Sequence, residues 1–245
     1  MRAASRIAGL ILLFLVVAPV HVATRLLLRR SRWPRRFLAA AGWLMGLRVR
    51  ILGKPVTRHS LIVANHTSWL DILILGGPVG SAFVSKDDLG HGLLHWLADQ
   101  NATVYVRRSH LKGARDQAVS LARALEGEKP VTVFPEGTTG PGTEVLPFRS
   151  TLLEAANFAA KDVEVRPVAI DYGAAVTEIA WHEETGVENV LRVLGRPGVL
   201  RVTVHGLPPL DRSGSRKQLA EQARSAIADS LGFKLPVHSP IGALE

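Results

Sequence analysis

The sequence predicts an α/β fold, a mostly parallel sheet flanked by helices, with one or two hydrophobic N-terminal helices ahead of it. Three observations support this prediction. Short β-rich runs alternate with helical patterns from residue 55 onward, as in folds built from parallel strands and crossover helices. Hydrophobic residues make up 47% of the chain and aromatic residues only 6%, which suits an aliphatic core. A length of 245 residues allows one sizeable core.

Strands are expected where β-branched and aliphatic residues cluster, at residues 61–65, 81–85, 103–107, 131–135, 163–171 and 200–206. Helices are expected to begin near Thr67, His91, Leu111, Arg149 and Ser215, and Gly232 is expected to end the last helix. The third helix carries an apolar stripe at helical spacing, made of Leu111, Ala114, Ala118, Leu121, Ala122 and Leu125. We therefore expect two parts: a membrane-anchoring segment, residues 1–54, and one α/β domain, residues 55–245.

The N-terminal segment is both hydrophobic and basic. Residues 7–20 are uncharged and almost wholly apolar, and the run continues to Leu28, close to the roughly 20 residues that cross a bilayer. An arginine cluster follows around Trp33, made of Arg25, Arg29, Arg30, Arg32, Arg35 and Arg36. Such a cluster favours an anionic membrane surface on the cytoplasmic side and disfavours a cleaved signal peptide. A spanning helix and two helices within one leaflet both remain open.

The distribution of charge argues against nucleic acid as a partner. The net charge is +9, and residues 1–70 hold 12 of the 30 Lys and Arg but none of the 21 Asp and Glu. The remaining chain is therefore slightly acidic, whereas a nucleic-acid-binding face needs basic residues on a folded polar surface. The chain has no cysteine, which excludes disulfides and thiolate metal sites.

A histidine and an aspartate follow the first expected strand, in the stretch ANHTSWLDIL, residues 64–73. His66 should stand at the carboxyl end of the strand, where open α/β sheets bind ligands. Thr67 and Ser68 can cap the next helix and leave its first N–H groups facing the same crevice. If His66 precedes the first helical turn, Asp71 can reach back to its ring and raise its basicity. The pair is thus a candidate for a general base.

Three further stretches carry polar residues at strand ends. VFPEGTTG, residues 133–140, brings an acid and a turn to a strand's carboxyl end. ATVYVRR, residues 102–108, ends a strand with two arginines, which suit an anionic head group. VRPVAI, residues 165–170, is a strand with a proline, which predicts an edge strand or a strand start.

In this order and spacing the four stretches resemble the glycerolipid acyltransferase family, which includes the lysophosphatidic acid acyltransferases. NHTSWLD is similar to the first conserved block, ATVYVRR to the second, FPEGTT to the third and RPVAI to the fourth. The resemblance covers about residues 60–175, and FVSKDDLG, residues 83–90, also resembles this family. Ala102 stands where the second block normally opens with glycine.

The resemblance implies roles for individual residues. His66 would be the base and Asp71 its partner. Substrate would be bound by Lys86, Arg108, Glu136, Gly137, Thr138 and Arg149, and Pro167 would lie in the acyl pocket. Thr139 departs from the family pattern, which usually has arginine there. That departure, with LPFRS and the later WHEETG, LGRPG and VTVHG stretches, looks closer to the branch that acylates lyso-ornithine lipid.

The implied activity is transfer of a fatty acyl group from an acyl-CoA or acyl-ACP thioester to a lysolipid hydroxyl. The first expected acceptor is lysophosphatidic acid, giving phosphatidic acid, and the alternative is lyso-ornithine lipid. Backbone N–H groups near the helix start could stabilise the oxyanion, a role that the sequence does not assign. No metal and no cofactor is required. The expected place is the inner (cytoplasmic) membrane, with the α/β domain on its cytoplasmic face.

Other functional classes have less support. No G-x-S-x-G elbow, Walker A or G-x-G-x-x-G stretch occurs in the chain, so a serine hydrolase and a nucleotide-binding enzyme are disfavoured. A non-catalytic membrane-surface protein would explain the arginine cluster but would leave His66, Asp71 and Glu136 without a role.

Overall fold

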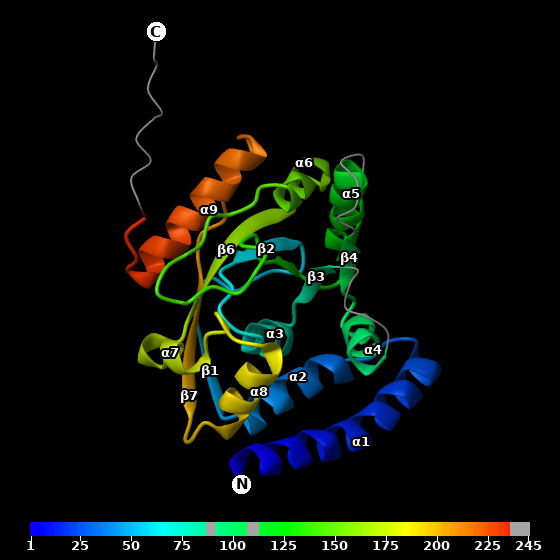
Figure 1. Ribbon diagram of the computed structural model, residues 1–245. Helices are drawn as coiled ribbons and strands as arrows, with labels where there is room; N and C mark the ends of the chain where they lie inside the picture. Colours follow the sequence, from blue (N-terminus) through cyan, green and yellow to red (C-terminus); the bar gives the residue numbers. More distant parts are fainter. Residues whose placement is uncertain (87–91, 107–112, 236–245) are drawn as a thin grey trace.

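The computed structural model describes residues 1–86, 92–106 and 113–235 (Figure 1). Its centre is one seven-stranded sheet in the order β1-β7-β6-β2-β5-β3-β4. The strands are β1 (Leu47–Gly53), β2 (Ser60–Ala64), β3 (Ala82–Lys86), β4 (Val104–Val106), β5 (Val131–Val133), β6 (Glu164–Asp171) and β7 (Leu200–Gly206). Five of them, β2 to β6, are parallel to their neighbours in this group, whereas β7 is antiparallel to β6 and β1 is parallel to β7. The predicted mostly parallel α/β sheet is confirmed.

Apolar residues on both faces explain why β2 lies at the centre. All five residues of β2 are buried. Ile62 and Ala64 belong to the core on one face, and Leu61 and Val63 to the core on the other. Since successive side chains of a strand point to opposite faces, a continuous apolar run is what a strand covered on both sides requires.

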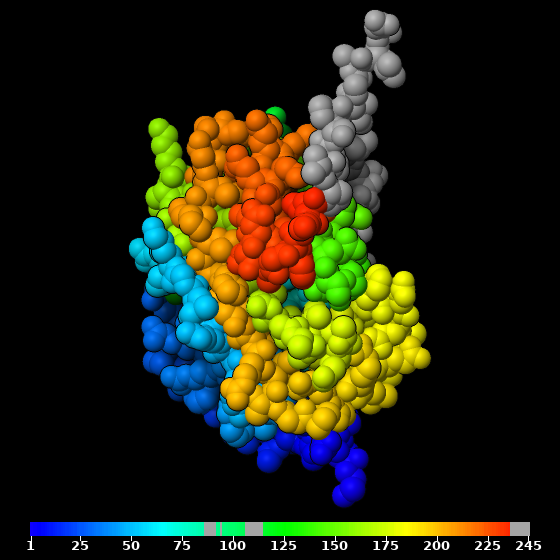
Figure 2. All heavy atoms as spheres, turned by 90° about the vertical axis from the view of Figure 1, so that its left-hand side faces the viewer, coloured from blue at the N-terminus to red at the C-terminus, as the bar shows by residue number. Residues whose placement is uncertain are grey.

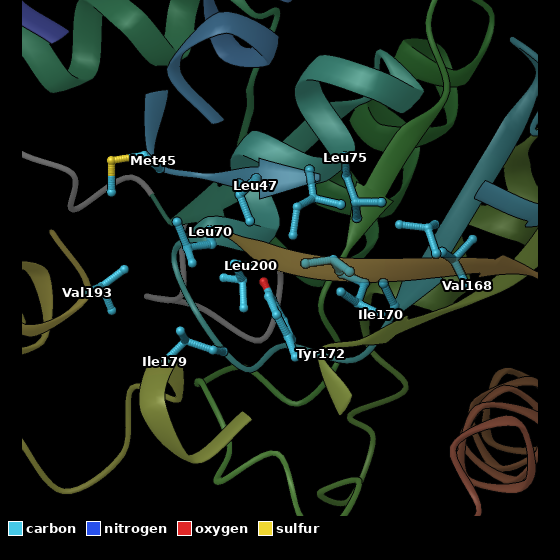
Figure 3. Packing of buried hydrophobic residues seen from close by; sticks show 14 of the residues in the cluster. Met45, Leu47, Leu70, Leu75, Val168, Ile170, Tyr172, Ile179, Val193 and Leu200 are labelled. Carbon is cyan, nitrogen blue, oxygen red and sulfur yellow. The ribbon is translucent and has the colours of Figure 1, made fainter. Parts of the chain in front are cut away.

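Helices cover both faces of the sheet. On one face lie α5 (Gly113–Leu125), α6 (Ala155–Phe158) and α9 (Arg216–Leu231). On the other lie α2 (Trp33–Leu44), α3 (Leu70–Ile74), α7 (Val176–Ile179) and α8 (Gly186–Gly195) (Figure 1). Figure 2 shows α9, in orange to red, on the upper part of the molecule and α8, in yellow, on the lower part. Apart from α1, the other helical elements of the described residues are the π-helix η1 (Leu75–Val79), α4 (Leu93–Gln100) and the 3-10 turns η2 (Leu152–Glu154) and η3 (Gly173–Ala175). In Figure 3, labelled side chains from this second face form one apolar cluster.

The helix predictions hold in part. Ser215 caps α9 and Gly232 ends it in the left-handed conformation, as expected. The stripe residues Ala118, Leu121, Ala122 and Leu125 are buried. The helix starts expected near His91 and Leu111 lie outside the described residues. The helix expected from Arg149 begins later, with the turn η2 and then α6. The expectation of a helix near Thr67 corresponds to α3, which begins at Leu70.

Strand β1 was not expected, because residues 47–53 fall inside the segment 1–54 that was predicted to anchor the chain. The stretch LRVRILG alternates apolar and basic residues and pairs along its whole length with β7. Its apolar side chains Leu47 and Val49 join the core. The basic excess of the N-terminal segment therefore includes Arg48 and Arg50, which are exposed on an edge strand.

The prediction of an edge strand or a strand start for the Pro167 stretch is wrong, because β6 lies between β7 and β2, with Pro167 in its middle. The N–H groups of Glu164 and Ile170 point toward β2, where they donate to the His59 carbonyl and to Asn65 Oδ1. By alternation, the nitrogen of Pro167 faces the β7 side. Pairing with β7 starts only at Val168, so the missing N–H falls beyond the ladder and leaves no lost hydrogen bond there.

The N-terminal helices lie against the domain. Helix α1 (Arg2–Leu28) is long and apolar enough to cross a membrane by length and composition. It runs along the lower side of the molecule in Figure 1, beneath α2. Near its start, Arg6 donates to the carbonyls of Val193, Leu194 and Arg196 at the end of α8. Near its end, His21 and Arg25 contact Gln100 of α4. Both ends of α1 are thus held by the domain.

Candidate active site

The loop after β2 brings His66 and Asp71 together. His66 Nδ1 lies 2.8 Å from Asp71 Oδ2. Asp71 is fully buried, and the His66 side chain is 19% exposed. Because the carboxylate oxygen is an acceptor, Nδ1 carries the proton and Nε2 is left as the basic nitrogen. The ring of His66 stacks on Phe134, with the centroids 4.1 Å apart, which fixes the plane of the imidazole.

Four donors surround the carboxylate of Asp71. Besides the His66 ring, the backbone N–H groups of Thr67 and Ser68 donate to Oδ2 at 2.8 and 3.0 Å. The hydroxyl of Tyr172 donates to Oδ1 at 2.5 Å. A buried carboxylate with this many donors is stabilised in its charged form.

The start of α3 differs from the expectation. The N-cap position is Trp69, which has no side-chain cap, and the Thr67 side chain does not cap the helix. The Ser68 hydroxyl oxygen accepts the N–H of Leu70, the first helical residue, in a long bond of 3.4 Å. Instead, Asp71 reaches back and binds the N–H groups of Thr67 and Ser68. These two N–H groups are therefore not free to bind a substrate oxyanion.

Glu136 holds the backbone of the histidine loop. Its Oε1 accepts the N–H of His66 at 2.8 Å, the backbone of Leu146 also hydrogen-bonds to it, and the residue is 5% exposed. Burial raises the pKa of Glu136 to about 8, while the hydrogen bonds from His66 and Leu146 oppose that rise. Near neutral pH this carboxyl is therefore mainly protonated. It supports the loop and faces backbone groups, although the family resemblance implied contact with substrate.

The turn after Glu136 carries the other expected contacts. Gly137 has φ 73°, a conformation that side chains with a Cβ rarely adopt. The guanidinium carbon of Arg149 lies 3.4 Å from the place where a Cβ of Gly137 would be. Thr138 and Arg149 are exposed. The structure thus brings Gly137, Thr138 and Arg149 to one surface, next to the loop of His66, whose carbonyl accepts the N–H of Gly140.

An apolar cavity of about 440 Å³ opens beside His66. Its lining includes Phe134, Phe83 and Trp69 near the histidine and Phe14 and His21 from α1. Further lining comes from α2 and α4. The cavity is roofed by the two N-terminal helices, and a flexible alkyl chain is the kind of ligand that such walls accommodate.

The other expected site residues either lie away from this cavity or fall outside the residues that the structure describes. Lys86 is the last residue of β3, and Arg108 lies outside the described residues. Pro167 sits in the middle of β6 beside Val63 and is not among the residues that line the cavity within the described part of the chain. Its assignment to an acyl pocket gains no support from this cavity.

Three residues around the site were missed by the sequence analysis: Tyr172, Phe134 and His21. Tyr172 and Phe134 each follow directly on a strand, β6 and β5, so their position at the carboxyl edge of the sheet was a usable signal. His21 gave none, since it is one polar residue in an apolar run. It is buried and binds Ser31 and Gln100.

The arrangement suits proton removal from a group that reaches His66 Nε2. An imidazole with a carboxylate on Nδ1 accepts a proton at Nε2 and is stabilised as imidazolium. The neighbouring cavity would place an apolar chain beside that nitrogen. This geometry fits attack of a hydroxyl on an acyl group carried by a long chain.

Comparison with known proteins agrees with this chemistry. The model of the family described as Acyltransferase matches residues 48–171. A lyso-ornithine lipid O-acyltransferase of Rhodobacter capsulatus is 34% identical over 77% of this chain and 72% of its own length. A 1-acyl-sn-glycerol-3-phosphate acyltransferase of Neisseria gonorrhoeae is 30% identical over 55% of this chain and 50% of its own.

A solved structure supports the fold. The 1-acyl-sn-glycerophosphate acyltransferase of Thermotoga maritima superposes with a TM-score of 0.61 at 24% identity, covering 96% of this chain and all of that one. The fold, the family model and the extent of the match to the first relative agree. The chain belongs to the Acyltransferase family and is an acyltransferase.

Proposed function

We propose that the protein transfers a fatty acyl group from a coenzyme A or acyl-carrier-protein thioester to the hydroxyl of a one-chain membrane lipid. The observation that carries the proposal is the His66–Asp71 pair, with its ring nitrogen and carboxylate oxygen 2.8 Å apart, beside an apolar cavity. His66 Nε2 takes the proton of the acceptor hydroxyl as that oxygen attacks the thioester carbonyl. Asp71 stabilises the imidazolium that forms.

The products balance without an acyl-enzyme. The tetrahedral intermediate breaks its carbon–sulfur bond, and the leaving thiolate takes the proton back from His66. The acceptor keeps the new ester bond. Glu136 keeps the histidine loop in place during these steps through its bond to the His66 N–H.

We favour lyso-ornithine lipid as the acceptor. The Rhodobacter relative named for that acceptor matches more of the chain, at higher identity, than the Neisseria relative named for glycerol phosphate. In addition, Thr139 donates its hydroxyl to the Trp181 carbonyl at 2.6 Å, and Trp181 donates its N–H to the Thr67 carbonyl. Thr139 therefore binds the WHEETG stretch, which resembles the ornithine branch, and its hydroxyl is not directed at a substrate phosphate.

Lysophosphatidic acid is the second candidate. Arg149 offers an exposed guanidinium at the Gly137 turn, with no carboxylate partner within the described residues. That cation suits the phosphate of lysophosphatidic acid as well as the carboxylate of ornithine. Arg149 thus supports an anionic group on the acceptor without choosing between the two.

The test measures transfer of a labelled acyl chain from one donor to each acceptor in parallel. Removing a general base typically costs about 10²- to 10⁴-fold in rate, so His66→Ala should lose transfer by that factor. The matched control is His59→Ala, at the other end of β2, where His59 pairs with Asp162 at 3.2 Å. Near-normal turnover in His66→Ala contradicts the mechanism. Faster transfer to lysophosphatidic acid overturns the preferred acceptor alone.

We further propose that α1 lies within one leaflet of the inner membrane, with the domain on the cytoplasmic face. Arg6 ties one end of α1 to α8, and His21 and Arg25 tie the other end to α4. A helix held at both ends by one domain cannot place its ends on opposite sides of a bilayer. Its outer residues remain free to face lipid: Ile7, Ile11, Leu12, Leu15, Val16, Val20, Val22, Leu26, Leu27 and Leu28 are exposed.

Because the chain has no cysteine, single cysteines can test this arrangement. Ala4→Cys and Arg30→Cys mark the two ends of α1. Both should react with an impermeant maleimide in inside-out vesicles and neither in right-side-out vesicles. Labelling of the two ends from opposite sides would show a spanning helix.

The predicted arginine cluster is used partly within the protein. Arg35 donates to the carbonyls of Gly77 and Pro78, Arg25 donates to Gln100 and Arg30 pairs with Glu128. Arg29, Arg32 and Arg36 are exposed, and we propose that these three contact anionic lipid.

A further inference from the structure

Tyr172 is a polar group in an apolar setting. It follows β6 directly and is 4% exposed, among the apolar side chains of one core cluster. In Figure 3 its hydroxyl is the one oxygen among the side chains drawn as sticks. A buried tyrosine hydroxyl needs a partner. Its partner is Asp71 Oδ1, at 2.5 Å, from a residue 101 positions away in the chain.

The hydrogen bonds of Asp71 are divided unequally between its two oxygens. Oδ2 accepts three N–H groups, from the His66 ring and from the backbone of Thr67 and Ser68. Oδ1 accepts the hydroxyl of Tyr172. A carboxylate has about four acceptor sites. Without Tyr172, the buried Oδ1 would have no partner that the structure shows, and the carboxylate would be less firmly held about its own axis.

The same bond also affects charge. A hydroxyl that donates to a carboxylate draws negative charge toward itself, so less remains on the oxygen facing the imidazole. Burial above all, and then the charge of Asp71, hold the pKa of Tyr172 well above its ordinary range. The hydroxyl therefore stays a donor throughout any practical assay range.

We propose that Tyr172 is a positioning residue for acyl transfer: through Asp71 Oδ1 it fixes the carboxylate that orients His66 and moderates the basicity of the imidazole. The inference rests on the proposed function, since it gives Tyr172 a role through the base His66. It differs from a purely structural tyrosine in one measurable respect. A structural tyrosine affects stability, whereas a positioning tyrosine also sets the pH at which the base loses activity.

Tyr172→Phe removes the hydroxyl and keeps the ring. The turnover number should fall about 10-fold, as for other losses of orientation, with little change in KM for either substrate. The acid limb of kcat/KM should move to higher pH by roughly half a unit to one unit, because the carboxylate then raises the basicity of His66 more strongly. The control is Tyr105→Phe, since the chain has only these two tyrosines. The Tyr105→Phe variant should keep the acid limb of its kcat/KM pH profile at the wild-type pH.

A graded change tests the electrostatic part without removing the hydrogen bond. In the Tyr105→Phe background, 3-fluorotyrosine incorporated throughout the chain occupies position 172 alone. Its more acidic hydroxyl is a stronger donor, so the acid limb should move to lower pH, opposite to the shift in Tyr172→Phe. This measurement also serves if Tyr172→Phe fails to fold.

The outcomes separate this inference from the proposed function. The role of Tyr172 is supported if the acid limb of the kcat/KM pH profile moves to higher pH in Tyr172→Phe and to lower pH in the 3-fluorotyrosine protein. Unchanged turnover and unchanged limbs in both proteins overturn it, even if His66→Ala is inactive as proposed. An active His66→Ala instead removes the mechanism on which the inference rests.

Discussion

Two buried carboxyl groups lie beside His66, and they differ in the number of hydrogen bonds that they accept. Asp71 accepts four hydrogen bonds, from Tyr172, the His66 ring and two backbone N–H groups. Glu136 accepts backbone N–H groups from His66 and Leu146, and burial raises its pKa to about 8. Donors to the charged form offset the cost of burying it, and burial without enough donors leaves the group protonated. The four donors around Asp71 suit a carboxylate that acts on His66 through its charge. Glu136, with fewer donors, instead holds the backbone of the histidine loop.

The largest expected effect separates the two groups by their charge. Asp71→Asn removes the negative charge and turns an amide toward N–H donors, so turnover should fall by about 10³- to 10⁴-fold, as when a histidine loses its orienting aspartate. Glu136→Gln keeps a neutral acceptor for the His66 N–H and should lower turnover by less than about 10-fold. Rates of labelled acyl transfer check both variants. Equal losses would show that Glu136 acts as a charged group.

The next effect concerns the supporting role of Glu136. Glu136→Ala leaves the N–H groups of His66 and Leu146 without their acceptor, so the free energy of unfolding should fall by about 2–4 kcal/mol. Denaturant titration in detergent measures this change. The control is Glu144→Ala, because Glu144 is exposed, and it should change stability by less than about 0.5 kcal/mol. A similar change in both variants would remove the support assigned to Glu136.

The third effect is a dependence of stability on pH. The folded-state pKa of Glu136, about 8, is raised above its ordinary value of 4.5. Between these values the unfolded chain has released the proton and the folded chain holds it, so stability falls as pH rises. The slope for one such proton is about 1.4 kcal/mol per pH unit. Stability of the wild type relative to Glu136→Gln should decline from pH 5 to pH 8 and then level off. A constant difference contradicts the raised pKa.

The sequence predicted the part of the site that is local in the chain. His66 and Asp71 are five positions apart, next to a largely apolar strand, so a strand end and a short loop were enough to bring them together. Glu136 and the Gly137 turn were also placed at the carboxyl edge of the sheet by the same reasoning. What a turn or a strand end fixes locally can be inferred from local pattern.

Contacts between residues far apart in the chain could not be inferred from local sequence patterns. The bond from Tyr172 to Asp71 depends on β6 lying beside β2, which no local pattern specifies. Pro167 was expected on an edge strand or at a strand start, because a proline has no N–H to donate to a neighbouring strand. The actual solution is that β7 begins to pair with β6 one residue later. Strand β1 was hidden because its arginines merge with the basic N-terminal segment. Each of these features follows from the strand order and not from composition.

The roof of the cavity has a consequence for which chains the enzyme can distinguish. Because α1 and α2 form that roof and α1 is proposed to lie in lipid, an alkyl chain can slide in sideways from the bilayer. Such a chain exchanges one hydrocarbon surrounding for another and gains almost no hydrophobic free energy. A chain arriving from water gains about 0.8 kcal/mol for each methylene that it buries. Discrimination among bilayer lipids must therefore come from the polar end of the molecule and from the shape of the walls.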